Sequence, residues 1–113
     1  MKTGMSDNFP SLISYSDNKL QIDYDVEQAE IEDMNGIKTV YKYKYIELDN
    51  HNPSYGELVS ALIHNIYSPD AEVALINNEL AETGTQEYQD YQTLRTHAKE
   101  IAKQVLSNLG VTP

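Results

Sequence analysis

The sequence contains no cysteine and no tryptophan, and only one phenylalanine. Without cysteine, disulfide scaffolds, thiolate zinc sites and cysteine nucleophiles are all excluded. Positive charge is also scarce, because 8 Lys and Arg residues stand against 18 Asp and Glu residues, which gives a formal net charge of −10. Since nucleic acids and anionic membranes attract cationic surfaces, this balance argues against both as partners.

Long apolar runs are missing as well. No stretch approaches the roughly 20 residues of a membrane-spanning helix, and the first residues lack the apolar segment of a signal peptide. We therefore expect a cytoplasmic protein or a virion component. The 113 residues correspond to a single domain, 1–113. Tyrosine, with nine copies, supplies most of the aromatic content, and its hydroxyl suits half-exposed faces and interfaces.

The pattern of apolar residues changes character near Pro53. Alternation dominates before this residue and helical spacing dominates after it, which is typical of an α+β fold. We expect residues 1–10 to be a flexible arm and residues 11–50 to form an antiparallel β-hairpin or a three-stranded meander. Residues 54–110 are predicted to form three α-helices.

The dipeptide Asn35-Gly36 is a strong hairpin signal, because both residue types accept positive φ. If these are the two turn residues, Met34 lies opposite Ile37 and the numbers of paired residues sum to 71. This register predicts the pairs Asp33–Lys38, Glu27–Lys44, Ile31–Val40 and Val26–Tyr45. Two apolar residues then fall on the face opposite to the tyrosines, which a β-bulge or a second buried surface would explain: Ile46 and Leu48.

One face of the predicted hairpin collects Tyr24 and Val26 from its first strand and Tyr41, Tyr43 and Tyr45 from its return strand. Three phenols on one face need hydrogen-bond partners or water if they are buried. Two interpretations stay open: the face is part of the core, or it contacts another protein.

Capping signals mark the three helices. The pattern from Ser54 to Glu57 is a capping box, Ser68 precedes a proline at the first helical position, and Thr85 begins the third helix. Gly110 ends the third helix. In the second helix, we expect the inward-facing residues to be Val73, Ala74, Ile76 and Leu80.

The acidic residues of the first long strand invite a test for calcium binding. Asp23, Asp25 and Glu27 fit positions 1, 3 and 5 of a calcium loop, but Gln28 and Met34 occupy the positions where glycine and glutamate are required. Alternation along a straight strand also points the carboxylates away from a common ion. The run therefore indicates a solvated strand face rather than a metal site.

Motifs for catalysis or cofactor binding are missing from the sequence. The histidines, His51, His64 and His97, do not have the spacing of a zinc site, and no nucleophile elbow, phosphate-binding loop or dinucleotide-binding loop occurs. We therefore assign no catalytic residue, no cofactor and no metal ligand, and we expect a protein that is not an enzyme.

The second half of the chain carries a family resemblance over roughly residues 40–105. Its features are a Y-x-E-L-V-x-A-L-I helix start, a Y-S-P-D joint at Tyr67, an A-L-I-N-N-E-L segment and an E-Y-x-x-Y opening at Glu87. This stretch resembles small uncharacterised proteins found among phage and prophage structural genes of gut bacteria. The resemblance implies a structural or tail-associated role and supplies no catalytic motif.

Three classes of function follow from these observations. The leading prediction is a non-enzymatic structural or accessory protein of a phage-like particle that contacts phage structural proteins or further copies of itself through Tyr24, Val26, Tyr41, Tyr43 and Tyr45. The alternative is an intracellular adaptor or regulator that binds a basic protein partner through the acidic strand. A small enzyme or metal protein is the third class.

Overall fold

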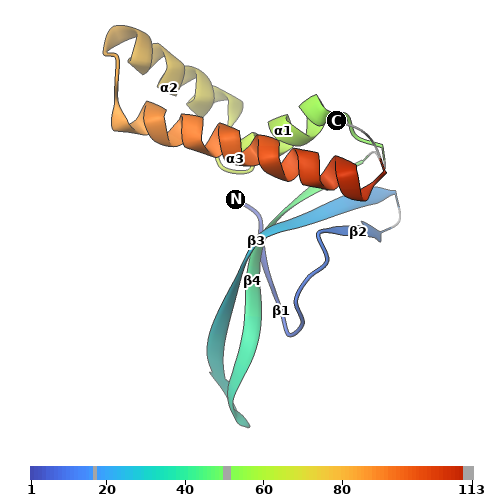
Figure 1. Ribbon diagram of the computed structural model, residues 1–113. Helices are drawn as coiled ribbons and strands as arrows, with labels where there is room; N and C mark the ends of the chain where they lie inside the picture. Colours follow the sequence, from blue (N-terminus) through green and yellow to red (C-terminus); the bar gives the residue numbers. More distant parts are fainter. Residues whose placement is uncertain (17, 50–51, 111–113) are drawn as a thin grey trace. The chain divides into compact units, whose positions relative to one another are not determined.

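Four strands precede three helices in the computed structural model, which describes residues 1–16, 18–49 and 52–110 (Figure 1). The α+β class predicted from the sequence is confirmed, with four strands where two or three were expected. The chain forms two compact units: Met1–Asn52, here called the sheet unit, and Pro53–Pro113, here called the helical unit.

The strands of the sheet unit are β1 (Thr3–Ser6), β2 (Ile13–Ser16), β3 (Lys19–Asp33) and β4 (Gly36–Leu48). They are antiparallel neighbours in the order β1-β4-β3-β2, so the long β3–β4 hairpin is central and a short strand lies on each of its edges (Figure 1). The expected flexible arm over residues 1–10 is wrong for β1, because this segment pairs with β4.

The hairpin itself is confirmed, but its predicted register is wrong by two residues. Asp33 pairs with Gly36, so Met34 and Asn35 are the turn residues. The Asp33 carboxylate accepts a hydrogen bond from the Asn35 N–H at 2.8 Å, which is the local side-chain bond that favours aspartate at the first position of a turn. The four predicted pairs are replaced by Asp33–Gly36, Glu27–Lys42, Ile31–Lys38 and Asp23–Tyr45, while Val40 pairs with Ala29.

Backbone geometry explains this difference. The predicted type I′ turn needs positive φ at both Asn35 and Gly36. Gly36 has a φ of +112°, but among the described non-glycine residues only Asp25 has a positive φ. The glycine therefore follows the turn instead of completing it. The turn lies one residue earlier in the chain than predicted, so the numbers of paired residues near the turn sum to 69 instead of 71.

A β-bulge interrupts the β3–β4 ladder between Tyr24 and Glu27. On β3, Asp25 and Val26 together lie opposite the single residue Tyr43, because the flanking pairs use the next residue on each side of it. An inserted residue of this kind bends the strand and inverts the alternation of its side chains.

The inversion decides which residues share a face. Ile22 and Tyr24 pair with Ile46 and Lys44, so the apolar residues at the end of the hairpin far from the turn lie on one face. The bulge explanation for Ile46 and Leu48 is confirmed. The predicted grouping of Tyr24 with the tyrosines of β4 is wrong for the same reason. The buried apolar side chains of the sheet unit are Leu20, Ile22, Tyr24, Val40 and Ile46.

The helical unit contains α1 (Tyr55–His64), α2 (Pro69–Ala81) and α3 (Gln86–Asn108). All three predicted N-caps are confirmed: each cap side chain accepts a hydrogen bond from a backbone N–H of the first turn, and the capping box of α1 is complete. Such caps satisfy backbone donors that the helix itself leaves free.

The predicted inward face of α2 is wrong. Leu75 is buried, and Glu72 and Glu79 beside it are only half exposed, so the face that points inward is polar at both ends. Glu79 accepts hydrogen bonds from the backbone N–H groups of Gly84 and Thr85, at 2.6 and 3.2 Å. Because the glutamates lie on the inner face of α2, the residues that were predicted to face inward are exposed to solvent instead: Val73, Ala74, Ile76 and Leu80.

Candidate functional site

The candidate site is the part of the hairpin from the bulge to the turn. β1 pairs with β4 only over Tyr41–Lys44, and β2 pairs with β3 only over Lys19–Ile22. Beyond those pairs, from Ala29 and Val40 to the turn, the hairpin continues as two strands. We call residues 27–40 the hairpin extension, and it forms the lower part of Figure 1.

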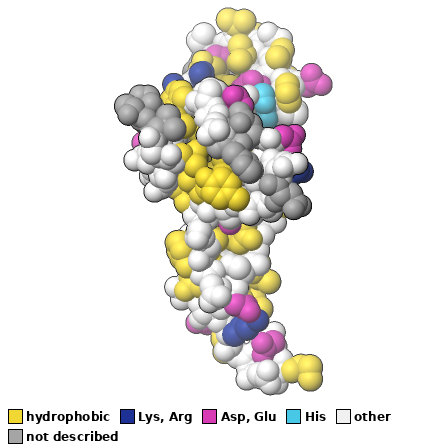
Figure 2. Space-filling model, turned by 90° about the vertical axis from the view of Figure 1, so that its right-hand side faces the viewer, with side chains coloured by type: hydrophobic (Ala, Val, Ile, Leu, Met, Phe, Trp, Pro, Cys, Tyr) yellow, Lys and Arg dark blue, Asp and Glu magenta, His cyan; other side chains and the backbone are white. Residues whose placement is uncertain are grey.

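Most side chains of the hairpin extension are exposed. Met34 is fully exposed in the turn and Ile37 is 71% exposed, while Val40 at the inner end is buried. In Figure 2, hydrophobic and acidic side chains reach the lowest end of the molecule, where this turn lies. The chain itself therefore leaves two large apolar side chains near the turn in contact with solvent.

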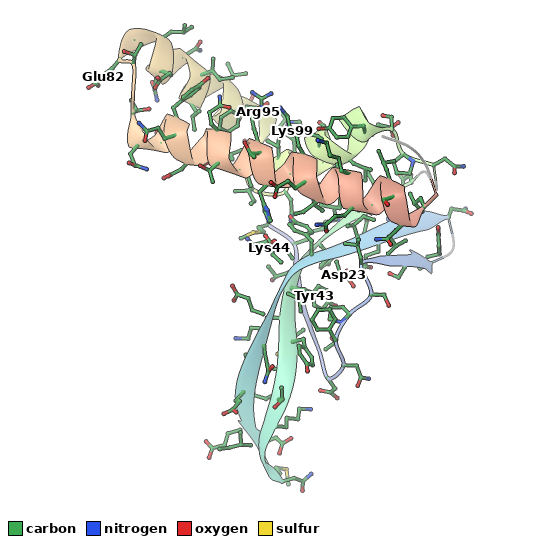
Figure 3. The ribbon with its side chains drawn as sticks, in the orientation of Figure 1. Asp23, Tyr43, Lys44, Glu82, Arg95 and Lys99 are labelled. Atoms are coloured by element: carbon green, nitrogen blue, oxygen red, sulfur yellow. The ribbon has the colours of Figure 1, made fainter. Side chains whose placement is uncertain are left out.

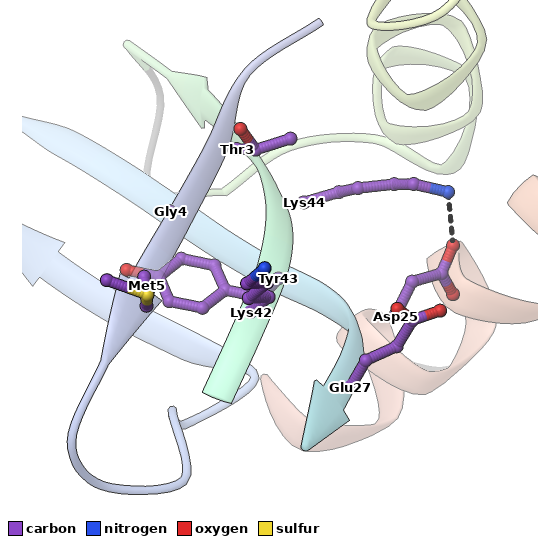
Figure 4. A pocket seen from close by; sticks show the side chains of 8 residues that line it. All are labelled: Thr3, Gly4, Met5, Asp25, Glu27, Lys42, Tyr43 and Lys44. Carbon is purple, nitrogen blue, oxygen red and sulfur yellow. Dashed lines mark hydrogen bonds and ion pairs between the residues drawn. The ribbon is translucent and has the colours of Figure 1, made fainter. Parts of the chain in front are cut away.

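A surface pocket of about 530 Å³ lies where the hairpin extension begins (Figure 4). At its edge the Lys44 Nζ lies 3.3 Å from an Asp25 carboxylate oxygen, and both side chains are half-buried. The lining brings two carboxylates and two ammonium groups together, so their charges offset one another. The lining residues are Thr3, Gly4, Met5, Asp25, Glu27, Lys42, Tyr43 and Lys44.

The bulge aims Asp25 at Lys44. Asp25 has a φ of +51°, in the left-handed region that aspartate and asparagine tolerate better than most residues. A half-exposed ion pair contributes at most about 1 kcal/mol, so this contact orients the side chain more than it stabilises the fold.

The three tyrosines of β4 are half-buried by the N-terminal segment. The Phe9 ring meets Tyr41 edge-on with 5.5 Å between centroids, and the Lys2 ammonium lies 6.0 Å from the Tyr45 ring centroid. Gly4 pairs with Tyr43, and a Cβ at Gly4 would lie 2.6 Å from the Tyr43 ring. These rings therefore pack within the sheet unit and keep an exposed edge, which leaves their predicted contact role open.

The other two residues of the predicted contact surface, Tyr24 and Val26, are on β3. Tyr24 is buried, with 5% of its surface exposed, and lies on the face opposite to the tyrosines of β4. The prediction that Tyr24 contacts a partner is therefore wrong. Val26 is half-buried in the bulge.

The acidic strand is less uniform than its sequence predicts. Asp23, labelled in Figure 3, is buried and accepts a hydrogen bond of 2.7 Å from the Gln21 amide. Burial raises the pKa of its carboxyl group, and the Gln21 hydrogen bond offsets part of that rise. The expected solvated face is thus wrong at Asp23, while Glu27, Glu30 and Glu32 are exposed.

The helical unit holds a polar cluster that sequence reasoning missed. The Ser60 hydroxyl lies 3.3 Å from His64 Nδ1, and His64 Nε2 lies 3.5 Å from the Glu72 carboxylate. The Tyr91 hydroxyl donates to the other Glu72 oxygen. Only Ser60 and His64 have a readable spacing, one helical turn; the other two residues join them through tertiary packing.

This cluster has the residue types of a hydrolytic triad without its other parts. Ser60 lies inside α1, where the backbone N–H groups next to it are bonded within the helix rather than available to stabilise an oxyanion. Tyr91 is buried, and desolvation together with its bond to Glu72 raises its pKa to about 12. The cluster ties α1, α2 and α3 together.

Of the other two histidines, only His97 lies within the described residues. His97 Nδ1 lies 4.0 Å from Glu100 on α3, and His51 lies outside the described residues. Across the part of the chain that the structure describes, no three His, Asp or Glu side chains converge to hold a metal ion.

Comparisons with protein families, with curated proteins and with solved structures find no match to this chain. Within residues 1–16, 18–49 and 52–110, none of the helices is both long enough and apolar enough to cross a membrane. The resemblance to phage-associated proteins stays a prediction.

Proposed function

We propose that this chain is a non-enzymatic protein that works through protein–protein contacts of its sheet unit, as a structural or accessory component of a phage-like particle, in the cytoplasm or the virion. The observation that carries the contact role is the hairpin extension. It projects past β1 and β2 as two strands and ends in exposed Met34, with exposed Ile37 beside the turn.

The hairpin extension buries too little of its own surface to be stable by itself, which supports a contact role for it. A two-stranded ribbon is only marginally stable in water, and a third strand or a covering surface is needed to bury its faces. Here only Val40 is buried within the hairpin extension. A partner that covers Ile37 and Met34 would supply the burial that the chain itself does not provide.

The tyrosines extend the same face toward the hairpin base. Ile37, Tyr41, Tyr43 and Tyr45 alternate along β4 and therefore share one face, and Phe9, 68% exposed, packs against Tyr41. We include Tyr41, Tyr43, Tyr45 and Val26 in the proposed contact surface and leave out the buried Tyr24. Aromatic rings with a polar edge are enriched at such interfaces.

The phage-like setting is supported by the sequence resemblance over residues 40–105. In the helical unit, the Ser60 hydroxyl and His64 lie within α1, where the neighbouring backbone N–H groups are bonded within the helix, which does not favour Ser60 as a nucleophile.

An adaptor that binds a basic partner is the second candidate. Of the three carboxylates predicted for it, Asp23 is buried and Asp25 is paired with Lys44, so only Glu27 faces solvent freely enough to meet a partner. The exposed carboxylates nearer the turn, Glu30 and Glu32, suit this role better.

Site-specific photocrosslinking in cells that carry the neighbouring genes tests the proposed function. A photoreactive amino acid in place of Ile37 is expected to give discrete crosslinked protein species, whereas the same group in place of the exposed Gln104 on α3 gives none. Crosslinks to tail or capsid proteins would support the phage-like setting. No discrete species from position 37 would contradict the contact role.

A further inference from the structure

The outer edge of β3 is open along the hairpin extension. β2 covers β3 up to Ile22, and the Asp23 N–H bonds to the Leu12 carbonyl at 3.0 Å. We call Glu27–Asp33 the β3 edge. Among the described residues no strand pairs with its outer side, so alternate backbone N–H and C=O groups point to solvent.

The β3 edge is strongly acidic. Its seven residues include the exposed carboxylates of Glu27, Glu30, Glu32 and Asp33, and no lysine or arginine. Two lysines of β4 lie opposite the β3 edge: Lys42 pairs with Glu27 and Lys38 pairs with Ile31. Lys38 is bound to Asp7 at 3.0 Å, and this ion pair raises the pKa of Lys38. The open backbone groups therefore lie in a field of negative charge.

This charge pattern disfavours a second copy of the chain as the added strand. If two β3 edges paired in antiparallel fashion about Glu30, Glu30 would face its own copy and Glu27 would face Asp33. Like charges directly opposite one another destabilise a strand pair, and charged edges are a known guard against self-pairing. A parallel pairing in register would also place every carboxylate beside its copy.

We propose that the β3 edge binds an extended, lysine- or arginine-rich segment of a partner protein, which adds to the sheet as a fifth strand. The inference rests on the proposed function, because it names the chemistry of the partner that the hairpin extension contacts. Main-chain hydrogen bonds supply the docking and alternate side chains supply the selectivity, as in other cases of strand addition.

The faces of β3 specify the pattern of the segment. Glu30 and Glu32 lie on one face, and Ala29 and Ile31 lie on the other, since the ladder from Glu27 onward alternates regularly. The added strand would therefore carry lysine or arginine at every second position, beside the two glutamates. Small or β-branched residues between them would lie beside Ala29 and Ile31.

A synthetic nine-residue peptide of alternating lysine and valine with blocked ends is the probe, and its binding to the full chain is measured by fluorescence anisotropy. We expect saturable binding that weakens at least tenfold when salt rises from 50 to 500 mM. The double variant Glu30→Lys/Glu32→Lys should lose at least tenfold in affinity. The matched control, Glu82→Lys/Glu100→Lys, changes two exposed carboxylates of the helical unit and should lose less than threefold.

Backbone methylation separates strand addition from simple charge attraction. Two peptides carry N-methyl groups at alternate positions, one on the odd residues and one on the even residues. Because only one set of N–H groups faces β3, one methylated peptide should lose binding and the other should retain it. Equal binding by both would overturn strand addition, and equal loss in the two double variants would overturn the β3 edge as the site.

Self-association gives an independent check. In sedimentation of the chain alone, we expect no dimer that depends on Glu30 and Glu32. A dimer that the Glu30→Lys/Glu32→Lys variant abolishes would identify a second copy of the chain as the occupant and contradict the proposal. Failure of every peptide test together with crosslinks from position 37 would overturn this inference and leave the proposed contact function standing. Absence of those crosslinks would count against the proposed function itself.

Discussion

The β3–β4 hairpin has two regions that differ in burial: its base, which is the end far from the turn, and the hairpin extension. At the base, Leu20 pairs with Leu48 and Ile22 with Ile46, and three of these four side chains are buried. In the hairpin extension, Ile31 pairs with Lys38 and Glu32 with Ile37, and most side chains meet solvent. One strand pair thus contributes to the core at one end and presents a surface at the other.

The bulge at Asp25 and Val26 is the boundary between these two regions. Without the inserted residue, the alternation that buries Ile22 and Tyr24 would continue in phase and place Glu30 on the same face as that core. With it, Glu30 and Glu32 share the face of Ile37 and the β4 tyrosines. A single local irregularity therefore decides which side chains are available to a partner.

Truncation of one isoleucine in each region should give the largest contrast. Ile22→Ala is expected to lower the free energy of unfolding by about 2–5 kcal/mol, because it leaves a cavity among buried side chains. Ile37→Ala, at a 71% exposed position, should change it by less than about 0.5 kcal/mol. Urea unfolding measures both, and equal losses would show that the hairpin extension is packed after all.

Substitutions at Asp25 test the boundary itself. Asp25→Val should cost about 1–3 kcal/mol, because a β-branched residue is strained at a φ of +51°. Asp25→Gly should be within about 0.5 kcal/mol of the parent, since glycine adopts this φ without strain and the half-exposed ion pair with Lys44 contributes little. A valine variant as stable as the glycine variant would contradict the bulge geometry.

Gly4→Ala tests whether β1 holds the tyrosines of β4. The new Cβ would lie 2.6 Å from the Tyr43 ring, so the ring must move. We expect a loss of about 1 kcal/mol and a changed tyrosine fluorescence. The control Gly56→Ala, at the second residue of α1, where the new Cβ would lie 4.0 Å from the Ser54 Oγ, should be neutral or slightly stabilising. An unchanged spectrum for Gly4→Ala would place the Tyr43 ring elsewhere.

Asp23→Asn gives the smallest expected effect and a pH signature. Because burial raises the folded-state pKa of Asp23 above its ordinary value of 3.8, the folded chain is favoured while this group is protonated. Its contribution is lost as pH rises through that raised pKa. Asp23→Asn should remove this slope and stabilise the chain at pH 7. A destabilised variant at pH 7 would contradict this assignment.

The local features of the fold could be predicted from the sequence, and the tertiary ones could not. Ser54, Ser68 and Thr85 act within one helical turn, so their capping roles were readable. The register was not, because the Asp33 side chain selects a turn that the Asn35-Gly36 signal does not indicate.

Two further features depend on contacts between distant residues. The sequence indicated the bulge at Asp25 only indirectly, because Ile46 and Leu48 are apolar on the face that the predicted register leaves to polar residues. The inward face of α2 is set by Glu72 and Glu79, whose partners lie in α3 and at its start. A hydrophobicity pattern alone assigns such carboxylates to the surface.

Amide hydrogen exchange of the chain alone, followed residue by residue by NMR, tests the open β3 edge most directly. At Leu20 and Ile22, which lie between β2 and β4, we predict slow exchange for both amides. Along Glu27–Asp33 we predict that fast and slow amides alternate, since every second N–H points to solvent. Uniformly slow exchange along Glu27–Asp33, equal to that at the base, would contradict the account.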